Sequence, residues 1–149
     1  MKRKLVTLGL LAAAAVGVSG ARALDRPGTI QISDAESKHT YVDLGRPGLS
    51  VGDVHVYKYL LFNRRITPRA IGRGEMSCTV TGKDTETCTA TYFLPKGEIV
   101  AEGAIGSRLI YGLAVVGGTG LYSNVRGTLT VTSLRQRPSR ELLVFRLDV

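Results

Sequence analysis

The chain of 149 residues contains no tryptophan, and only two histidines, two cysteines and two methionines. Two cysteines and two histidines that are distant in sequence provide too few ligands for a metal centre, so we expect no metal site and no cofactor. His39 and His55 belong to no motif, and no Gly-x-Ser-x-Gly sequence marks a nucleophile. The sequence therefore shows no general acid–base group. The catalytic residues stay unknown, and it is left open whether the protein is an enzyme.

The one long hydrophobic run lies near the N-terminus and is too short to cross a bilayer comfortably. It extends from Leu5 to Val18, follows the cations Lys2-Arg3-Lys4 and precedes Ala21-Arg22-Ala23, which fits the small-x-small cleavage rule. This pattern predicts a signal peptide over residues 1–23 and a mature domain over residues 24–149; a retained N-terminal anchor is the alternative. We expect a secreted, extracellular or cell-envelope protein with no stable membrane insertion after cleavage.

The excess of positive charge belongs largely to this N-terminal segment. The full chain carries a formal net charge of +8. Residues 1–23 hold four cations and no acid, so the mature domain carries +4. Its remaining arginines are spread thinly along the chain, which favours a solvated surface over a basic stripe. We therefore expect no nucleic-acid partner.

The two cysteines have a spacing that suits a disulfide. Cys78 and Cys88 lie in two predicted strands joined by a polar turn centred on Lys83. Such a hairpin places the two cysteines directly opposite each other, within reach of a bond. Export into an oxidising compartment makes pairing the expected outcome, and a free, reactive Cys78 is the alternative.

Strand and turn patterns follow one another through the mature domain, with no convincing helix, repeat or linker. The predicted strands are 29–33, 40–44, 53–62, 70–81, 87–94, 98–105, 109–116, 125–134 and 141–147. The segment 40–44 is either a strand or an extended lead-in. Seven to nine short strands at near-regular spacing indicate an all-β barrel or sandwich in a single domain.

Alternation along the strands assigns side chains to two faces. Charged groups are rarely buried unpaired, so Lys58, Glu98 and Glu102 mark the outer face. The opposite face carries the residues expected inside, which are His55, Tyr57, Tyr59, Tyr92, Ile99, Ala101 and Ile105. An apolar lumen with phenol hydroxyls and an imidazole suits a small lipophilic ligand. A packed core with tyrosines that reach the rim fits these residues equally well.

A glycine-rich segment connects an apolar strand to an alternating one. No helix pattern and no Gly-Lys-Ser/Thr follow it, so we interpret it as a structural hairpin turn and not as a phosphate-binding loop. Its residues, Gly117-Gly118-Thr119-Gly120-x-Tyr122-x-x-x-Arg126-Gly127, resemble the GGTG-x-F/Y…RG signature of the dirigent proteins.

The order of the other segments resembles the allene oxide cyclase-like barrel over roughly residues 29–148. The matching segments are Val42-Asp43-Leu44-Gly45, Ser50-Val51-Gly52-Asp53, Gly74-x-x-x-Cys78, Cys88-x-Ala90-x-Tyr92 and Gly97-x-Ile99-x-x-x-Gly103. The resemblance implies a single eight-stranded antiparallel calycin-like β-barrel. It also implies a homo-oligomer, since plant relatives often form trimers.

The resemblance includes departures from the plant cyclases. Their lumenal glutamate on the first strand corresponds to Gln31, their asparagine to Tyr59 and their tyrosine to Ile105. Without those polar groups we do not expect true allene oxide cyclase activity. Arg126 matches the arginine of the RG signature and is a candidate lumen residue; a surface charge or hairpin-end ion pair is the alternative.

Two hypotheses about function follow. In the first, an exported barrel binds a small apolar molecule and steers its cyclisation or isomerisation by holding one conformer and excluding water. The candidate ligand-binding residues are Gln31, His55, Tyr57, Tyr59, Tyr92, Ile99, Ile105 and Arg126. In the second, a non-enzymatic extracellular or envelope barrel has a structural or assembly role. An open cavity favours the first hypothesis, and a lumen filled by its tyrosines favours the second.

Overall fold

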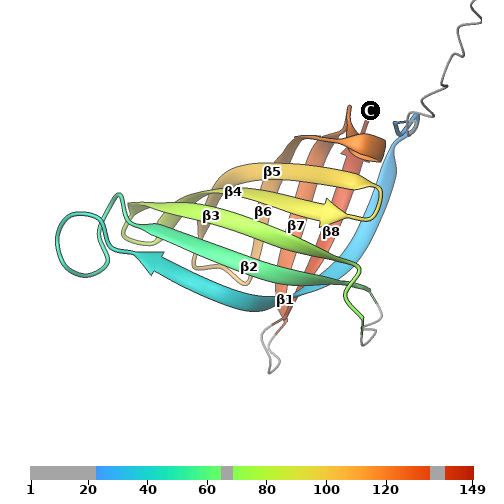
Figure 1. Ribbon diagram of the computed structural model, residues 1–149. Helices are drawn as coiled ribbons and strands as arrows, with labels where there is room; N and C mark the ends of the chain where they lie inside the picture. Colours follow the sequence, from blue (N-terminus) through green and yellow to red (C-terminus); the bar gives the residue numbers. More distant parts are fainter. Residues whose placement is uncertain (1–22, 65–68, 135–139) are drawn as a thin grey trace, which may run out of the picture.

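The computed structural model describes residues 23–64, 69–134 and 140–149. Over these residues the chain forms eight antiparallel strands that close into one barrel in sequence order (Figure 1). The strands are β1 (Gly28–Val42), β2 (Val54–Asn63), β3 (Gly72–Gly82), β4 (Thr85–Leu94), β5 (Gly97–Gly106), β6 (Ile110–Gly118), β7 (Arg126–Leu134) and β8 (Arg140–Asp148). The predicted eight-stranded all-β barrel is confirmed. The predicted signal peptide falls almost entirely in residues 1–22, outside the described part of the chain.

The first strand is longer than the sequence pattern predicts. The predicted strands 29–33 and 40–44 are parts of the single strand β1, which continues through the polar residues between them. The register against β2 shifts between Glu36 and Lys38, which is a β-bulge. A bulge moves side chains from one face to the other, so the inward residues are even-numbered up to Glu36 and odd-numbered from His39 onward. Because the inward positions change from even to odd numbers at the bulge, the sequence shows no continuous alternation, and β1 is predicted as two separate strands.

One end of the barrel is filled with apolar side chains. Phe145, Leu61 and Ile99 are fully buried there, and the Tyr92 ring meets the Phe145 ring edge-on with centroids 5.1 Å apart. The short 3-10 helix η1 (Gly120–Tyr122) lies between β6 and β7 at this end and contributes the buried Tyr122. This filled half, the packed half, comprises the strand ends nearest the hairpin turn between β4 and β5. It supplies most of the hydrophobic core.

The glycine-rich segment is a structural feature of the packed half. Gly118 is the last residue of β6 and pairs with Ile99 of β5. A Cβ atom at Gly118 would stand 2.7 Å from the Tyr122 carbonyl oxygen and would also meet that of Glu98. Gly120 has φ +59°, in the left-handed region that favours glycine. The turn therefore begins after Gly118, later than the sequence predicts. Glycine is required at position 118 because neighbouring backbone atoms leave no room for a Cβ atom, and not because of a positive φ.

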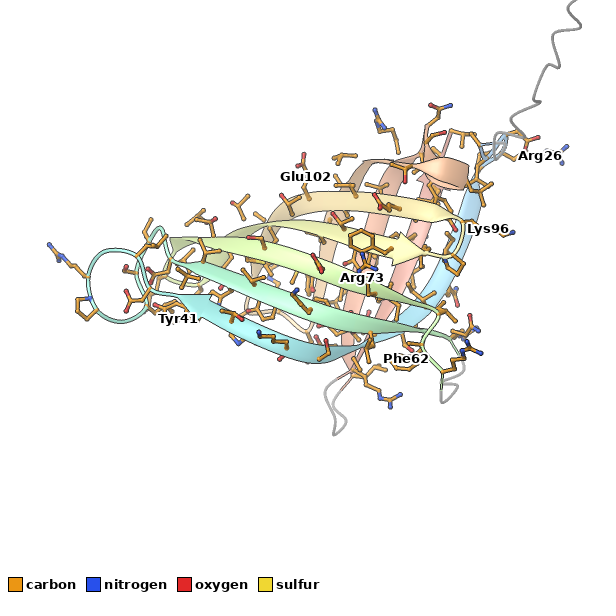
Figure 2. The ribbon with its side chains drawn as sticks, in the orientation of Figure 1. Arg26, Tyr41, Phe62, Arg73, Lys96 and Glu102 are labelled. Atoms are coloured by element: carbon orange, nitrogen blue, oxygen red, sulfur yellow. A yellow bond between two sulfur atoms is a disulfide. The ribbon has the colours of Figure 1, made fainter. Side chains whose placement is uncertain are left out.

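Polar side chains cover the outside of the barrel. The Lys58 ammonium lies 3.6 Å from the Glu75 carboxylate. Arg73 stacks over the Phe93 ring at 4.0 Å, and Figure 2 shows it together with Glu102 on the outer surface. Lys58 and Glu102 are exposed, as their predicted outward orientation requires. These contacts confirm the inside–outside assignment of β2 and β5.

The loop between β1 and β2 is organised by a buried aspartate. The Asp53 carboxylate accepts hydrogen bonds from the Tyr41 hydroxyl at 2.7 Å and from the backbone amides of Leu44 and Ser50 at 2.7 and 2.5 Å. These donors, with the Tyr41 hydroxyl first, lower the pKa of Asp53 to about 2. Asp53 therefore holds the two ends of this loop together.

The wall of the barrel separates at the other end. The paired residues of β5 and β6 run from Ile99 to Glu102 on β5. Beyond Glu102 the pairing of β5 with β6 ends, while β5 stays paired with β4 as far as Gly106 and β6 stays paired with β7 from Ile110 to Val115. A groove of about 610 Å³ occupies this gap, with Ile105, Arg108 and Tyr111 among its lining residues. The end that contains this gap is the open half of the barrel.

Candidate functional site in the open half of the barrel

Most of the predicted lumen residues do face the interior. Tyr59, Tyr92 and Ile99 are buried, and Tyr57 and Ile105 pack against the core while partly accessible. They divide between the two halves, however. Tyr92 and Ile99 help to fill the packed half, whereas Tyr57, Tyr59 and Ile105 line a cavity of about 240 Å³ in the open half.

Two predicted lumen residues lie on the outer face. Gln31 is exposed and pairs with Val144, and its neighbour Ile32 points inward in its place. Arg126 is also exposed, and its guanidinium donates a hydrogen bond to the Val125 carbonyl oxygen at 2.9 Å. The lumen placement of both residues is wrong, because strand period 2 puts each of them beside an inward neighbour. The alternative interpretation of Arg126 as a surface charge agrees with its exposure.

A row of aromatic and imidazole rings lines one side of the open half. Tyr57 and His39 stack with ring centroids 4.5 Å apart and planes 4° from parallel. Tyr57 also stacks with Tyr59 at 6.2 Å. Nε2 of His39 and Nδ1 of His55 are 2.8 Å apart, a hydrogen-bonding distance. The bulge in β1 turns His39 inward, which is why two histidines 16 residues apart in sequence meet here.

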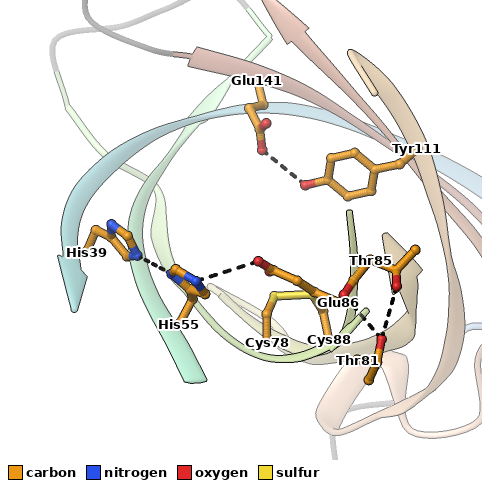
Figure 3. Close-up of a disulfide and its surroundings, with 9 residues drawn as sticks. All are labelled: His39, His55, Cys78, Thr81, Thr85, Glu86, Cys88, Tyr111 and Glu141. Carbon is orange, nitrogen blue, oxygen red and sulfur yellow. Dashed lines mark hydrogen bonds and ion pairs between the residues drawn. A yellow bond between two sulfur atoms is a disulfide. The ribbon is translucent and has the colours of Figure 1, made fainter. Parts of the chain in front are cut away.

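The disulfide lies on the inner face beside this row. Cys78 and Cys88 are fully buried and bonded, with Cα atoms 4.0 Å apart, so the predicted pairing is confirmed. His55 is the register partner of Cys78 on β2. Its Nε2 atom lies 3.7 Å from Oε1 of Glu86, two residues before Cys88. Figure 3 shows the histidine pair, Glu86 and the disulfide as one group.

Two carboxyl groups face each other on the neighbouring strands β1 and β8. Asp34 of β1 is the register partner of Glu141 of β8. Asp34 is only 2% exposed, and its Oδ1 atom has no hydrogen-bond partner among the described groups. Burial, and after it the charge of Glu141, raises the pKa of Asp34 to about 8. This raised pKa favours the protonated form of Asp34, whose carboxyl group lines the cavity.

The Glu141 carboxyl group is held in place by two hydroxyls. Ser133 donates a hydrogen bond to Oε1 at 2.8 Å, and Tyr111 donates a longer one to Oε2 at 3.4 Å. Burial, followed by the charge of Glu141, raises the pKa of Tyr111, so its phenol stays protonated. Figure 3 shows this pair across the interior from the histidines and the disulfide. Asp34, Glu141, Tyr111 and Ser133 all line the cavity of about 240 Å³.

The cavity is open on more than one side. A second hollow of about 310 Å³ shares Tyr57 and Ile105 with it and extends to Glu86. The groove between β5 and β6 shares Ile105, Arg108 and Tyr111. The lumen is therefore hollow at this end, whereas the tyrosine Tyr92 helps to fill the other end.

Sequence analysis did not identify the carboxyl pair, which strand pairing brings together from β1 and β8. Strand alternation predicts an inward side chain at both positions, because Asp34 follows the inward Ile32 by two residues and Glu141 precedes the buried Leu143 by two. The rule that charged side chains face outward leads to the opposite assignment, and the pair is therefore missed. Gln31, which corresponds by resemblance to the lumenal acid of the plant cyclases, lies three residues before Asp34, the buried acid of β1.

The family of the chain follows from its sequence as a whole. The model of the allene oxide cyclase barrel-like domain matches residues 29–145, and the chain belongs to this family. No curated protein sequence matches the chain. No helix in the described ranges is long and apolar enough to cross a membrane.

Solved structures share the barrel. A pyocyanin demethylase superposes with a TM-score of 0.70 and 26% identity, over 81% of this chain and 100% of that one. A Diels-Alderase from Streptomyces koyangensis gives a TM-score of 0.67 with 14% identity, over 82% of this chain but only 63% of that one. A pterocarpan synthase dirigent protein gives a TM-score of 0.65 with 13% identity, over 96% of this chain and 98% of that one. The last two similarities concern the fold alone.

Proposed function

We propose that the open half of the barrel binds a small ring compound and steers its cyclisation or isomerisation. The observation that carries this proposal is a cavity of about 240 Å³ in which three tyrosines, Met76 and Ile105 lie beside a group of ionisable and hydroxyl side chains, and in which one buried carboxyl oxygen of Asp34 has no partner. The other members of the polar group are Glu36, Arg108, Ser133 and Glu141. Aromatic walls with converging polar groups are typical of small-molecule sites. A buried polar atom without a partner costs stability, and a ligand oxygen would satisfy it.

The proposed chemistry depends on the proton of Asp34. With a pKa of about 8, this carboxyl group matches the operating pH of a general acid better than an ordinary aspartate does. It would donate a hydrogen bond to a carbonyl or hydroxyl oxygen of the ligand. Glu141, fixed by Ser133, stands beside it as a second carboxyl group for proton transfer. Tyr57 and Tyr59 would stack on the ring and hold one conformer.

The comparison with the demethylase supplies a first test compound. That relative is named for acting on pyocyanin, and at 26% identity it is aligned over its whole length. We propose that this chain accepts planar ring compounds of similar size. Pyocyanin and neutral ring compounds that carry a carbonyl group are the probes to titrate first.

Calorimetric titration of these probes into the protein tests the proposal. Binding is expected for the wild type, and an Ile105→Glu substitution should weaken binding of the neutral probes more than 10-fold, because it replaces an apolar contact of the cavity with a further carboxylate. Asp34→Asn should retain binding within about 10-fold and abolish any turnover of a bound probe. Glu102→Gln, on the outer face, is the matched control.

The alternative role is structural. It is supported by the packed half, where Tyr92 and Phe145 fill the interior. Should no probe bind, and should mass spectrometry of the purified protein find no copurified small molecule, the ligand-binding proposal would fail and the structural role would stand.

We further propose that the protein is exported and that residues 1–23 are removed. The N-terminal pattern and the disulfide support this. The backbone amide of Leu24 donates to the Leu121 carbonyl at 2.8 Å, so the predicted first residue of the mature chain is bonded to the barrel. N-terminal sequencing of the exported protein would contradict the proposal if it recovered Leu5–Val18. The predicted homo-oligomer is tested by the native mass.

A further inference from the structure

The second group of chemically active side chains in the barrel surrounds the disulfide, and the proposed function does not use it. The Sγ atoms of Cys78 and Cys88 and a carboxylate oxygen of Glu86 all lie within 4.8 Å of one another. Nε2 of His55 lies 3.7 Å from that glutamate. Two sulfurs and one carboxylate therefore converge from β3 and β4, and the His55 imidazole on the neighbouring strand β2 lies next to that carboxylate.

We propose that these four residues form a binding site for a zinc-type divalent cation when the disulfide is reduced. Zn²⁺ takes four ligands in a tetrahedron from thiolate, imidazole and carboxylate groups, which are the groups present here. Two thiolates on one zinc ion stand about 3.8 Å apart, given Zn–S bonds of about 2.3 Å. Cysteines directly opposite each other on paired strands satisfy that spacing once the S–S bond is broken.

Reduction of the Cys78–Cys88 disulfide requires an added reductant. A phosphine or dithiol supplies two electrons, and with two protons the disulfide becomes two thiols. Binding of M²⁺ then displaces both thiol protons, because the thiolates are the ligands. In the oxidised protein the same two sulfurs are bonded to each other and cannot act as thiolate ligands. Disulfide and metal are therefore mutually exclusive occupants of one place.

The histidine pair gives the site its second feature. A histidine that binds a metal through Nε2 must carry its proton on Nδ1, and a hydrogen-bond acceptor there fixes that tautomer. His39 offers its Nε2 atom at 2.8 Å from Nδ1 of His55. His39 is thus a positioning residue, held in turn by its stacking on Tyr57. The sequence argument against a metal site depended on the distance between the histidines along the chain, and folding removes that distance.

Cobalt titration distinguishes the two states. Co²⁺ added to protein reduced with a phosphine should bind at one equivalent, with the intense visible bands of a tetrahedral ion and a thiolate-to-cobalt charge-transfer band. Zn²⁺ should displace Co²⁺ and abolish the visible bands and the charge-transfer band. The oxidised protein should show neither kind of band when Co²⁺ is added. Reduced, folded protein that binds no cobalt would overturn the proposal.

Variants test which side chains contribute. Glu86→Gln and His55→Gln should each lower the cobalt affinity at least 10-fold and change the visible bands. His39→Phe should lower the affinity about 10-fold with a smaller spectral change, the effect expected for loss of a hydrogen-bond partner of a ligand. Glu102→Gln is the control and should bind as the wild type. Equal affinity in all variants would mean that the thiols alone capture cobalt, and the four-ligand site would be rejected.

Loss of the disulfide can itself unfold the barrel, so stability is measured in parallel. Under reducing conditions Zn²⁺ should raise the unfolding midpoint, and the rise should grow with its concentration because the metal binds the folded state. Under oxidising conditions the midpoint should not move. If the reduced chain is unfolded without metal, Zn²⁺ must restore the native circular dichroism, and failure to do so would equally overturn the proposal.

Discussion

The packed half and the open half of this barrel are made by the same strands and the same alternation, yet their interiors differ in kind. In the packed half the inward positions of β8 are Phe145 and Leu147, both buried. In the open half the inward position of the same strand is Glu141, in contact with Tyr111 and Ser133. The interior therefore changes along the barrel axis, from apolar packing at one end to a hollow lined by ionisable and hydroxyl groups at the other.

The difference also shows in how each half is tied together. The packed half relies on apolar contact and on backbone approaches that exclude a Cβ atom at Gly118. The open half relies on the disulfide, the hydrogen-bonded histidine pair and the Asp53 loop. Such polar connections stabilise less than a packed core does, and they leave room for a ligand.

The largest test of this comparison is Gly118→Val. Its Cβ atom would collide with two carbonyl oxygens and with the Tyr122 side chain, none of which is a flexible chain end. We expect loss of the folded barrel, seen as loss of cooperative urea unfolding. Gly117→Ala is the matched control, because the nearest atom to its Cβ is the flexible Arg126 side chain at 3.4 Å. A Gly118→Val protein as stable as wild type would contradict the account of the packed half.

Truncation of one large side chain in each half sharpens the contrast. Phe145→Ala should cost about 3–5 kcal/mol in the free energy of unfolding, since it leaves a cavity in a filled interior. Ile105→Ala should cost only about 1 kcal/mol, because its side chain already borders a cavity. Urea denaturation measures both values. Equal costs would show that the two halves are packed alike.

Two aspartates should give opposite pH dependences. The pKa of Asp34 is about 8 in the folded protein and 3.8 as a free group, so the folded state holds the extra proton. Stability should therefore fall as the pH rises from about 4 to about 8, by an order of a few kcal/mol. The fall should disappear in Asp34→Asn. Thermal unfolding across this pH range measures it, and an unchanged slope in the variant would reject the raised pKa.

The pKa of Asp53, by contrast, is lowered to about 2 by its three donors. The folded state releases the proton more readily than the unfolded state. Asp53 therefore contributes stability above a pH of about 4, and this contribution is lost as the pH falls toward 2. Asp53→Asn should flatten the acid limb of the stability profile and leave the neutral-to-alkaline limb unchanged.

The smallest expected effect concerns ligand preference. Tyr57→Phe removes one hydroxyl from the cavity wall and keeps the ring that stacks on His39. We expect a change of about 1 kcal/mol in the affinity for ligands that can accept a hydrogen bond, with unfolding nearly unchanged. Calorimetry with paired probes, with and without an acceptor oxygen, measures the difference. A large decrease in the free energy of unfolding would instead show that the Tyr57 hydroxyl contributes to folding as strongly as a side chain of the packed half.

Several features of the protein were set by local sequence. Period-2 alternation with Lys58 and Glu102 fixed which face of β2 and β5 points inward, because an unpaired charge is costly to bury. The ten-residue spacing of Cys78 and Cys88 around a polar turn fixed their bond. The glycine-rich segment and the order of motifs indicated the family and, through it, the barrel.

Tertiary structure decided the contents of the open half. Asp34 and Glu141 are 107 residues apart along the chain and become register partners only because β1 and β8 close the barrel. His39 reaches His55 only because a bulge in β1 changes the inward parity. Closure and bulges are properties of strand pairing across the whole sheet. Alternation within a single strand therefore predicts its buried face, but not which charged groups the closed barrel places together.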